Sequence, residues 1–228
     1  KRAIEDHFDI SYELEHQIKG TSKEHYLTEI RSVITKCTFS YTRQIEMKGL
    51  GHAILCGENL IGNQPFAVLL ADDLCDAPDK GVLSQMVELY KKYNCSIVAI
   101  EEIPKEDTNK YGVIAGNEIE PGIFMVKDMV EKPEPEVAPS NLAIIGRYIL
   151  TPDIFDIIRE TKPGKGGEIQ ITDALLTQAK NGMVLAYKFK GERFDCGSID
   201  GFVKATNYFY DKSIKNEKKE EKKDNGKK

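Results

Sequence analysis

Two neighbouring aspartates follow an apolar run in the stretch FAVLLADDLCD, residues 66–76. The run has the character of a buried strand, and Asp72 and Asp73 stand where it ends. Carboxylates at a strand end can bind a hard divalent cation, because proteins hold Mg²⁺ with one or two carboxylates together with phosphate oxygens. Aspartate also favours turns, however. This stretch alone therefore leaves a metal site and a simple turn about equally open.

A second aspartate has a comparable position in RFDCGSIDG, residues 193–201. Asp195 ends an apparent strand and precedes Gly197 and Ser198, where a helix is expected to begin. Ligands of open α/β sheets lie outside the carboxyl ends of the strands, and a helix start offers N–H groups to anions. Two acids at like positions on one sheet are what a Mg²⁺–phosphate site requires. A helix cap is the alternative role for Asp195.

A glutamate and a lysine are neighbours in VEKP, residues 130–133. Consecutive side chains of a strand point to opposite faces, so Glu131 and Lys132 can share a site where the strand bends before Pro133. The lysine could neutralise a phosphate, and the glutamate could accept hydrogen bonds from sugar hydroxyls. Taken alone, the motif is more simply interpreted as an exposed, charged strand end.

Alternating strands and helices are expected to position these residues. Apolar, strand-like runs alternate with segments of helical periodicity, and the strands are apolar almost throughout, which favours an α/β sheet covered on both faces. The predicted strands lie at 37–44, 66–70, 95–103, 111–119, 123–133, 141–150 and 183–198, and the predicted helices at 49–62, 78–94, 151–160, 168–182 and 199–212.

The composition excludes several classes of protein. The chain has 228 residues and a net charge of −5, so it has no electrostatic footprint for nucleic acid, and no apolar run reaches the roughly 20 residues of a membrane span. Its five cysteines form no C-x-x-C pair or Cys/His cluster, which favours reduced thiols in a cytoplasmic protein. One domain is predicted over residues 1–210, and the charged segment 211–228 is predicted to be a disordered tail.

The order of eight motifs resembles one enzyme family. They are KRAIEDHFD, RQIEMKGLGHAILC, VLLADDL, KYGVIAG, VEKP, NLAIIGRYIL, GGEIQITDAL and FDCGS, spread over about nine-tenths of the chain. Together they are similar to the bacterial UTP–glucose-1-phosphate uridylyltransferases, also called UDP-glucose pyrophosphorylases. The resemblance implies a Rossmann-like fold with a mixed, mostly parallel sheet flanked by helices, and a homodimer or homotetramer.

The resemblance also implies a reaction. A phosphate oxygen of glucose 1-phosphate attacks the α-phosphorus of UTP in line, which gives UDP-glucose and releases pyrophosphate. That oxygen is already ionised at neutral pH, so no general base is needed, and catalysis rests on positioning and charge stabilisation by Mg²⁺ and cationic side chains.

The roles implied by the resemblance fall on ten residues. Asp72 and Asp195 would hold the Mg²⁺ and, with Lys132 on the sugar phosphate, would form the catalytic set. The remaining expectations are that Gln44 and Gly49 read the uracil edge, Gly112 lies close to the sugar ring, Glu131 binds glucose hydroxyls, Glu168 supports the site, and Thr172 and Asp173 cap a helix.

The family's N-terminal strand and its G-x-G-T-R loop with a downstream lysine, which cradle the triphosphate, are not found in this sequence. Removing one preorganised donor typically costs about 10²–10³ in rate. We therefore expect the chain as given to be inactive alone and to fold poorly, with exposed strand edges and apolar surface.

Three rival interpretations stay open at this stage. A metal-dependent glycosyltransferase also places acids after a strand, although VEKP together with FDCGS favours nucleotidyl transfer. A non-catalytic nucleotide-sugar sensor or scaffold would bind UDP-glucose without turnover. In an ordinary α/β binding domain, the acids would serve only as caps.

Overall fold

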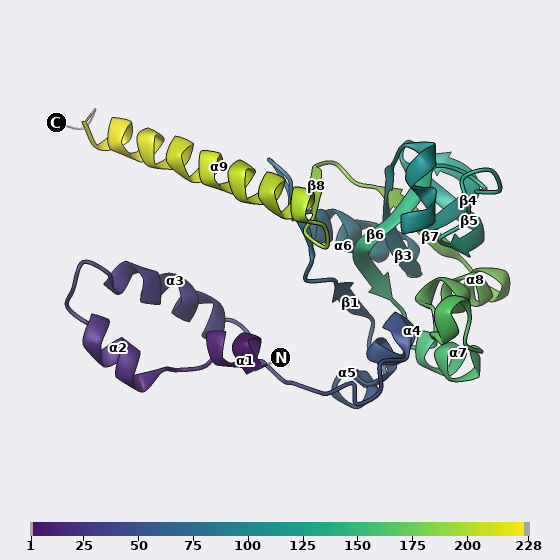
Figure 1. Ribbon diagram of the computed structural model, residues 1–228, viewed down its shortest axis with the longest axis horizontal. Coiled ribbons are helices and arrows are strands. Elements are labelled where there is room, and N and C mark those ends of the chain that lie inside the picture. The colour runs from purple at the N-terminus through teal and green to yellow at the C-terminus, as the bar shows by residue number, and fades with distance from the viewer. Residues whose placement is uncertain (1, 226–228) are drawn as a thin grey trace. The chain divides into compact units, whose positions relative to one another are not determined.

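Two compact units divide the chain, the first ending at Ile45 and the second beginning at Glu46. The computed structural model describes residues 2–225 (Figure 1). The first unit contains helices α1 (Arg2–His7), α2 (Tyr12–Ile18) and α3 (Glu24–Ile34), and an ion pair between Glu15 and Arg31 joins α2 to α3. The strand predicted at 37–44 is wrong, because this segment has no regular secondary structure. A strand needs a partner to satisfy its N–H and C=O groups, and none of the described strands pairs with it.

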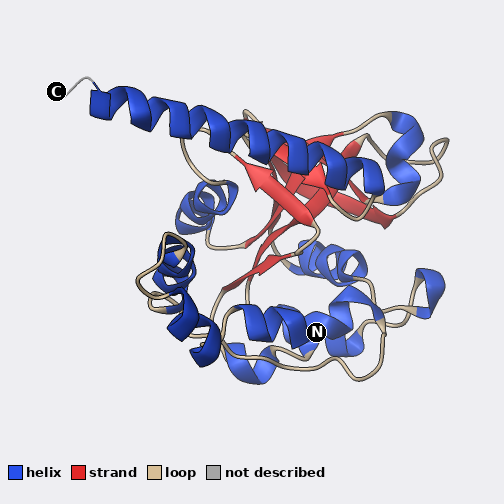
Figure 2. Ribbon diagram, turned by 60° about the vertical axis from the view of Figure 1, so that its left-hand side comes forward, coloured by secondary structure: helices blue, strands red, loops and turns tan. Residues whose placement is uncertain are grey.

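The second unit combines helices with strands (Figure 2). Its elements are α4 (Gly49–Leu55), α5 (Glu58–Ile61), β1 (Phe66–Leu69), β2 (Asp73–Asp76), α6 (Val82–Tyr93), β3 (Ser96–Glu102), the 3₁₀ helix η1 (Lys105–Lys110), β4 (Gly112–Glu120), β5 (Ile123–Glu131), β6 (Leu142–Leu150), α7 (Ile154–Glu160), the 3₁₀ turn η2 (Lys165–Gly167), α8 (Ile171–Asn181), β7 (Val184–Lys188), β8 (Glu192–Asp195) and α9 (Ile199–Asn225).

The main sheet is mixed and has six strands in the order β1-β6-β3-β7-β5-β4. A further pairing of β4 with β6 closes part of the sheet on itself. Among the pairings of the described strands, β3–β7 is the one parallel contact, so the expectation of a mostly parallel sheet is wrong. Near-continuous apolar strands indicate burial on both faces, and antiparallel strands meet that condition here as well as parallel ones would.

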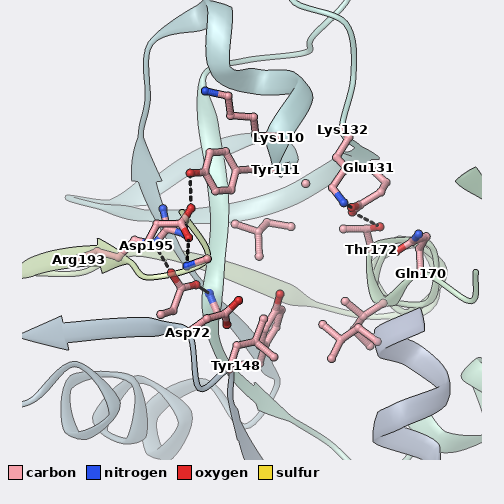
Figure 3. A pocket seen from close by; sticks show the side chains of 18 of the residues that line it. Asp72, Lys110, Tyr111, Glu131, Lys132, Tyr148, Gln170, Thr172, Arg193 and Asp195 are labelled. Atoms are coloured by element: carbon pink, nitrogen blue, oxygen red, sulfur yellow. Dashed lines mark hydrogen bonds and ion pairs between the residues drawn. The ribbon is translucent and has the colours of Figure 1, made fainter. Parts of the chain in front are cut away.

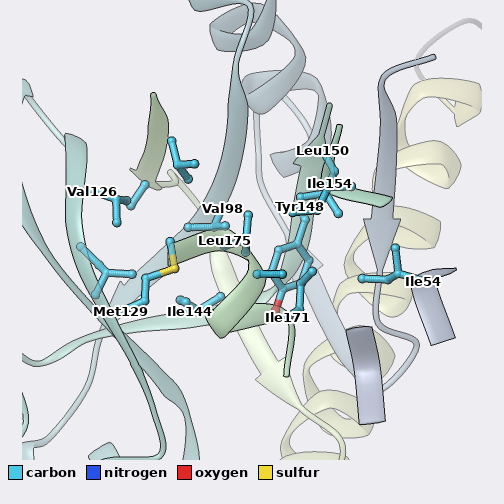
Figure 4. Packing of buried hydrophobic residues seen from close by; sticks show 14 of the residues in the cluster. Ile54, Val98, Val126, Met129, Ile144, Tyr148, Leu150, Ile154, Ile171 and Leu175 are labelled. Atoms are coloured by element: carbon cyan, nitrogen blue, oxygen red, sulfur yellow. The ribbon is translucent and has the colours of Figure 1, made fainter. Parts of the chain in front are cut away.

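Strand β3 shows how both faces of the sheet are buried. Val98 and Ile100 pack into a cluster with α4, α7 and α8, whereas the alternate residues Ile97 and Ala99 pack against α6 on the other face. All four side chains are fully inaccessible to solvent. Figure 4 shows the first of these clusters, in which Val98 lies beside the residues of α7 and α8. This two-sided core holds the strand ends in place, and the site is built at those ends.

Helix α9 continues through the segment that composition assigned to a disordered tail. It runs from Ile199 to Asn225, and residues 226–228 lie outside the described part. The Asp76 carboxylate accepts hydrogen bonds from the Tyr208 hydroxyl at 2.7 Å and from Lys212, so the first half of the helix is anchored. Lysine and glutamate are strong helix formers, and elongating an existing helix is far easier than starting one. Among residues 2–225, no helix combines the length and apolar character needed to cross a bilayer.

Candidate active site

A cavity of about 480 Å³ opens where several strands of the second unit end. Its walls come from the β1–β2 turn, the start of β4, the end of β5, the start of α8 and the end of β8 (Figure 3). Of the residues predicted to form the site, the cavity brings together Asp72, Gly112, Glu131, Lys132, Glu168 and Asp195. The view shows the aspartates on one side of the cavity and the Glu131–Lys132 pair on the other.

A two-stranded ribbon places Asp72 beside Asp195. Strands β2 and β8 pair antiparallel with Asp73 opposite Asp195, and the Cys196 N–H donates to the Asp72 carbonyl at 2.7 Å. The Asp195 carboxylate accepts hydrogen bonds from the Tyr111 hydroxyl at 2.7 Å and from the Gly197 N–H at 3.0 Å. No such bond reaches the exposed Asp72 carboxylate from another residue of the described chain.

The donor set at this ribbon fits a hard divalent cation that also binds phosphate. Two carboxylates face one cavity, which matches the small number of protein ligands that Mg²⁺ usually takes. Within the described residues there is no group of three or more His, Cys, Asp or Glu side chains arranged to hold a metal. A cation here would therefore complete its coordination with phosphate oxygens and water.

The neighbouring Asp73 has a different role from Asp72, because it is buried and fully engaged. It is 6% exposed, and its carboxylate accepts hydrogen bonds from the Arg193 Nε and from the Gly146 N–H at 2.6 Å. Arg193 also pairs with Glu101 at 2.7 Å and with Asp195 at 3.3 Å. Burial alone would lower the pKa of the Arg193 guanidinium, but Asp73 and the other acids raise it above its ordinary value. Asp73 thus holds the ribbon together, and Asp72 stays available to a ligand.

Glu131 and Lys132 both reach the cavity because the chain bends between them. Lys132 has a φ of +46°, outside the strand region, and its N–H donates to the Tyr111 carbonyl at 3.0 Å. The Thr172 hydroxyl donates to the Glu131 Oε2 at 3.0 Å. A Cβ at Gly112 would lie 2.7 Å from Thr172 and 3.1 Å from Glu131, so glycine is required for this close approach.

Gly49, Glu168 and Gln44 are the remaining predicted residues. Gly49 begins α4 with a φ of +89°, and a Cβ there would lie 2.7 Å from the Glu168 Cβ, so the two residues are in close contact. Glu168 lines the cavity and accepts a hydrogen bond from Gln170 at 3.2 Å. Gln44 belongs to the first compact unit. The roles expected of these residues stay predictions.

The helix-capping roles expected of Thr172 and Asp173 are wrong. Helix α8 begins after Gln170, which occupies the N-cap position and makes no capping hydrogen bond with its side chain. Thr172 is 2% exposed and is bonded to Glu131 instead. Asp173 lies in the first turn, where burial raises the pKa of its carboxyl.

Residues 8–212 match the nucleotidyl transferase family. The chain belongs to this family. It is 68% identical over 216 residues to a UTP–glucose-1-phosphate uridylyltransferase of Pseudomonas aeruginosa, an alignment that covers 94% of this chain and 77% of the relative.

Two solved structures have the same fold as this nucleotidyl transferase. An apo UDP-glucose pyrophosphorylase aligns with a TM-score of 0.89 and 64% identity, over 93% of this chain and 78% of that one. A UDP-glucose pyrophosphorylase complexed with UDP-glucose aligns with a TM-score of 0.86 and 62% identity over the same shares. The family resemblance predicted from the eight motifs is confirmed.

Among the lining residues that sequence reasoning missed are four with large polar or charged side chains that face the cavity of this nucleotidyl transferase. Lys110 and Tyr111 come from the end of η1 and the residue after it, Tyr148 from β6 and Arg193 from β8. Tyr148 is 5% exposed, and its hydroxyl points into the cavity without a hydrogen bond to another residue of the described chain (Figure 3). Lys110 and Tyr111 flank Gly112 in KYG, and Arg193 begins RFD, so proximity to two expected site residues was the available signal.

Proposed function

We propose that this chain is a UTP–glucose-1-phosphate uridylyltransferase that converts UTP and glucose 1-phosphate into UDP-glucose and pyrophosphate. The observation that carries the proposal is that one cavity sets the carboxylates of Asp72 and Asp195 across from Glu131 and Lys132. One side suits a cation with its nucleotide phosphates, and the other suits a sugar phosphate. The name of the Pseudomonas aeruginosa relative supports this substrate pair over a glycosyltransferase reaction.

Lys132 and Glu131 divide the recognition of the sugar phosphate between them. The Lys132 side chain is about half exposed, so its ammonium can reach a phosphate in the cavity and offset its charge. The Glu131 side chain is 16% exposed and fixed by Thr172, which leaves the remaining carboxylate positions for sugar hydroxyls. With no side chain at Gly112, the ring can approach the backbone of β4.

Asp72 and Asp195 would hold a Mg²⁺ ion in this proposal. When bound, the ion would offset phosphate charge and act as a Lewis acid on the phosphoryl group. The chain's own contribution is to hold two carboxylates side by side on a ribbon anchored by the Asp73–Arg193 pair. Since the attacking phosphate oxygen is ionised at neutral pH, alignment of the substrates supplies most of what catalysis requires.

Three residues are proposed to serve the nucleotide base. Gln44 and Gly49 would read the uracil edge, and Glu168 would support this part of the site. Gly49 contacts Glu168 directly, so an added side chain at position 49 would displace a residue of the cavity wall. The homo-oligomeric state and the cytoplasmic location expected from the sequence stay predictions. All five cysteines are free thiols in the structure.

The test is Mg²⁺-dependent formation of UDP-glucose from UTP and glucose 1-phosphate by the purified protein. Turnover by residues 1–228 alone would show that the inactivity expected without the G-x-G-T-R loop is wrong. Asp72→Asn should lower turnover at least 100-fold, because one metal carboxylate is lost without a change in volume. Asp79→Asn is the matched control, since it neutralises an exposed turn acid outside this cavity. Equal turnover by Asp72→Asn and Asp79→Asn would overturn the metal assignment. A wild-type protein that hydrolyses UDP-glucose or transfers its glucose, but forms none from UTP, would overturn the reaction itself.

A further inference from the structure

Tyr111 connects the two sides of the cavity through three separate contacts. Its hydroxyl donates to the Asp195 Oδ2 at 2.7 Å, and its carbonyl accepts from the Lys132 N–H at 3.0 Å. Its ring lies against the Arg193 guanidinium, with 4.9 Å between the guanidinium carbon and the ring centroid. Figure 3 shows the Tyr111 hydroxyl directed at Asp195.

The Asp195 carboxylate has few other constraints. Its side chain is 33% exposed at the end of β8, where a carboxylate without partners would rotate. The Gly197 N–H holds Oδ1 at 3.0 Å, and the Arg193 Nη2 approaches Oδ2 at 3.3 Å, which is longer than an ordinary hydrogen bond. The Tyr111 hydroxyl therefore makes the shorter contact to Oδ2. A carboxylate has about four lone-pair sites, so positions remain for a cation.

Tyr111 is itself held firmly enough to act as a support. It lies between η1 and β4, and its N–H donates to the Thr108 carbonyl. Thr108 is fully buried, and its hydroxyl donates to the Lys105 carbonyl at 2.9 Å. Backbone on one side and Arg193 on the other thus fix the direction of the phenol.

We propose that Tyr111 is a positioning residue whose hydroxyl holds the Asp195 carboxylate in the orientation that binds a divalent cation. This inference rests on the proposed function, because it takes Asp195 as a metal ligand. Tyr111 does not touch the reacting atoms in this arrangement. It acts through Asp195. Its carbonyl also accepts a hydrogen bond from the Lys132 N–H, which fixes the position of Lys132 relative to Asp195.

Tyr111→Phe removes the hydroxyl and keeps the ring on Arg193. Loss of a hydrogen-bonding partner of a metal ligand typically costs about 10–100-fold in metal affinity or activity. We expect affinity for Mn²⁺, a paramagnetic substitute for Mg²⁺, to fall about 10-fold in the presence of UDP-glucose. The measurement is the free Mn²⁺ signal in an electron paramagnetic resonance titration, which requires no turnover.

Tyr93→Phe is the matched control. The Tyr93 hydroxyl also donates to a carboxylate, that of Glu120, outside the cavity. Tyr93→Phe should keep the wild-type Mn²⁺ affinity, and both variants should melt within a few degrees of each other. In an Asp195→Asn background, Tyr111→Phe should change Mn²⁺ binding less than two-fold, because the group through which it acts is gone.

Several results would overturn the inference. One is a Tyr111→Phe protein with Mn²⁺ affinity within two-fold of wild type. Another is a Tyr111→Phe substitution that lowers Mn²⁺ affinity equally whether position 195 carries Asp or Asn. A Tyr111→Phe protein without a cooperative melt would also refute it, since the hydroxyl would then maintain the fold rather than orient one acid. If the wild type itself binds no Mn²⁺ with UDP-glucose, the proposed function fails instead.

Discussion

The hydrogen bond from Thr172 to Glu131 predicts how the sugar side of the cavity responds to a single lost oxygen. Thr172 is 2% exposed and its hydroxyl lies 3.0 Å from Glu131 Oε2. Thr172→Val replaces that hydroxyl with a methyl group of similar size. The methyl group that already faces Gly112 is retained, so the packing changes little and the Glu131 carboxylate loses a donor.

The expected magnitude follows from the exposure of the two partners. A hydrogen bond to a charged group contributes about 1.5–3 kcal/mol when both partners are buried. The Glu131 side chain is 16% exposed, so water from the cavity can replace part of the lost bond. We therefore expect an effect of about 1–1.5 kcal/mol on sugar binding, which corresponds to about a 5–15-fold change in affinity.

Initial-rate kinetics with each substrate varied in turn separate this effect from a general loss of structure. The KM for glucose 1-phosphate should rise 5–15-fold in Thr172→Val, while the KM for UTP should stay within two-fold of wild type. Thr172→Ser is the matched variant, because it keeps the hydroxyl and removes the methyl group, and it should bind the sugar phosphate like wild type. Equal increases in both KM values, or a larger defect in Thr172→Ser than in Thr172→Val, would refute the reasoning.

Three further predictions concern other parts of the site and its support. Tyr148→Phe removes a buried hydroxyl that faces the cavity. In steady-state assays it should raise the KM for UTP or for glucose 1-phosphate about 5–10-fold, and the melting temperature should not fall. Arg193→Met leaves the buried Asp73 carboxylate without its cation and should lower the free energy of unfolding in urea by about 3–5 kcal/mol; an unchanged urea midpoint would contradict it. Hydrogen bonds from Lys212 and Tyr208 lower the pKa of Asp76 below its ordinary value of 3.8. The stability it contributes is therefore fully present above pH 3.8 and is lost as the pH falls through the lower folded pKa. Urea unfolding from pH 5 downward should show this loss in wild type and less of it in Asp76→Asn.

The sheet illustrates what periodicity can and cannot predict. The apolar runs at β3 and β6 correctly predicted strands buried on two faces, because every residue of such a strand must avoid water. The direction of the strands depends on which segments pair across the chain. β3 pairs with β6 antiparallel and with β7 parallel, and nothing in their composition distinguishes the two cases.

The aspartates show the same limit at the level of single residues. Asp72 and Asp73 are chemically identical neighbours, and the apolar run before them predicts a strand end for both. They differ because Asp73 meets Arg193, 120 residues further along the chain, whereas the Asp72 carboxylate faces the cavity. The choice of Asp72 as the proposed ligand came from the family resemblance, and the exposed position of its carboxylate in the cavity is compatible with that role.

The residues that sequence reasoning missed are those whose role depends on a distant partner. Tyr111 contacts Asp195 across 84 positions of the chain, and Arg193 connects Asp73 to Glu101 across comparable distances. Reactive groups can be recognised in a sequence because the chemistry of a carboxylate or an ammonium depends on the side chain alone. The residues that position them are tyrosines and arginines, which acquire this role only when strands from different parts of the chain are paired. A search for further positioning residues in this nucleotidyl transferase should therefore begin from the contacts of Asp72, Glu131 and Asp195 rather than from motifs.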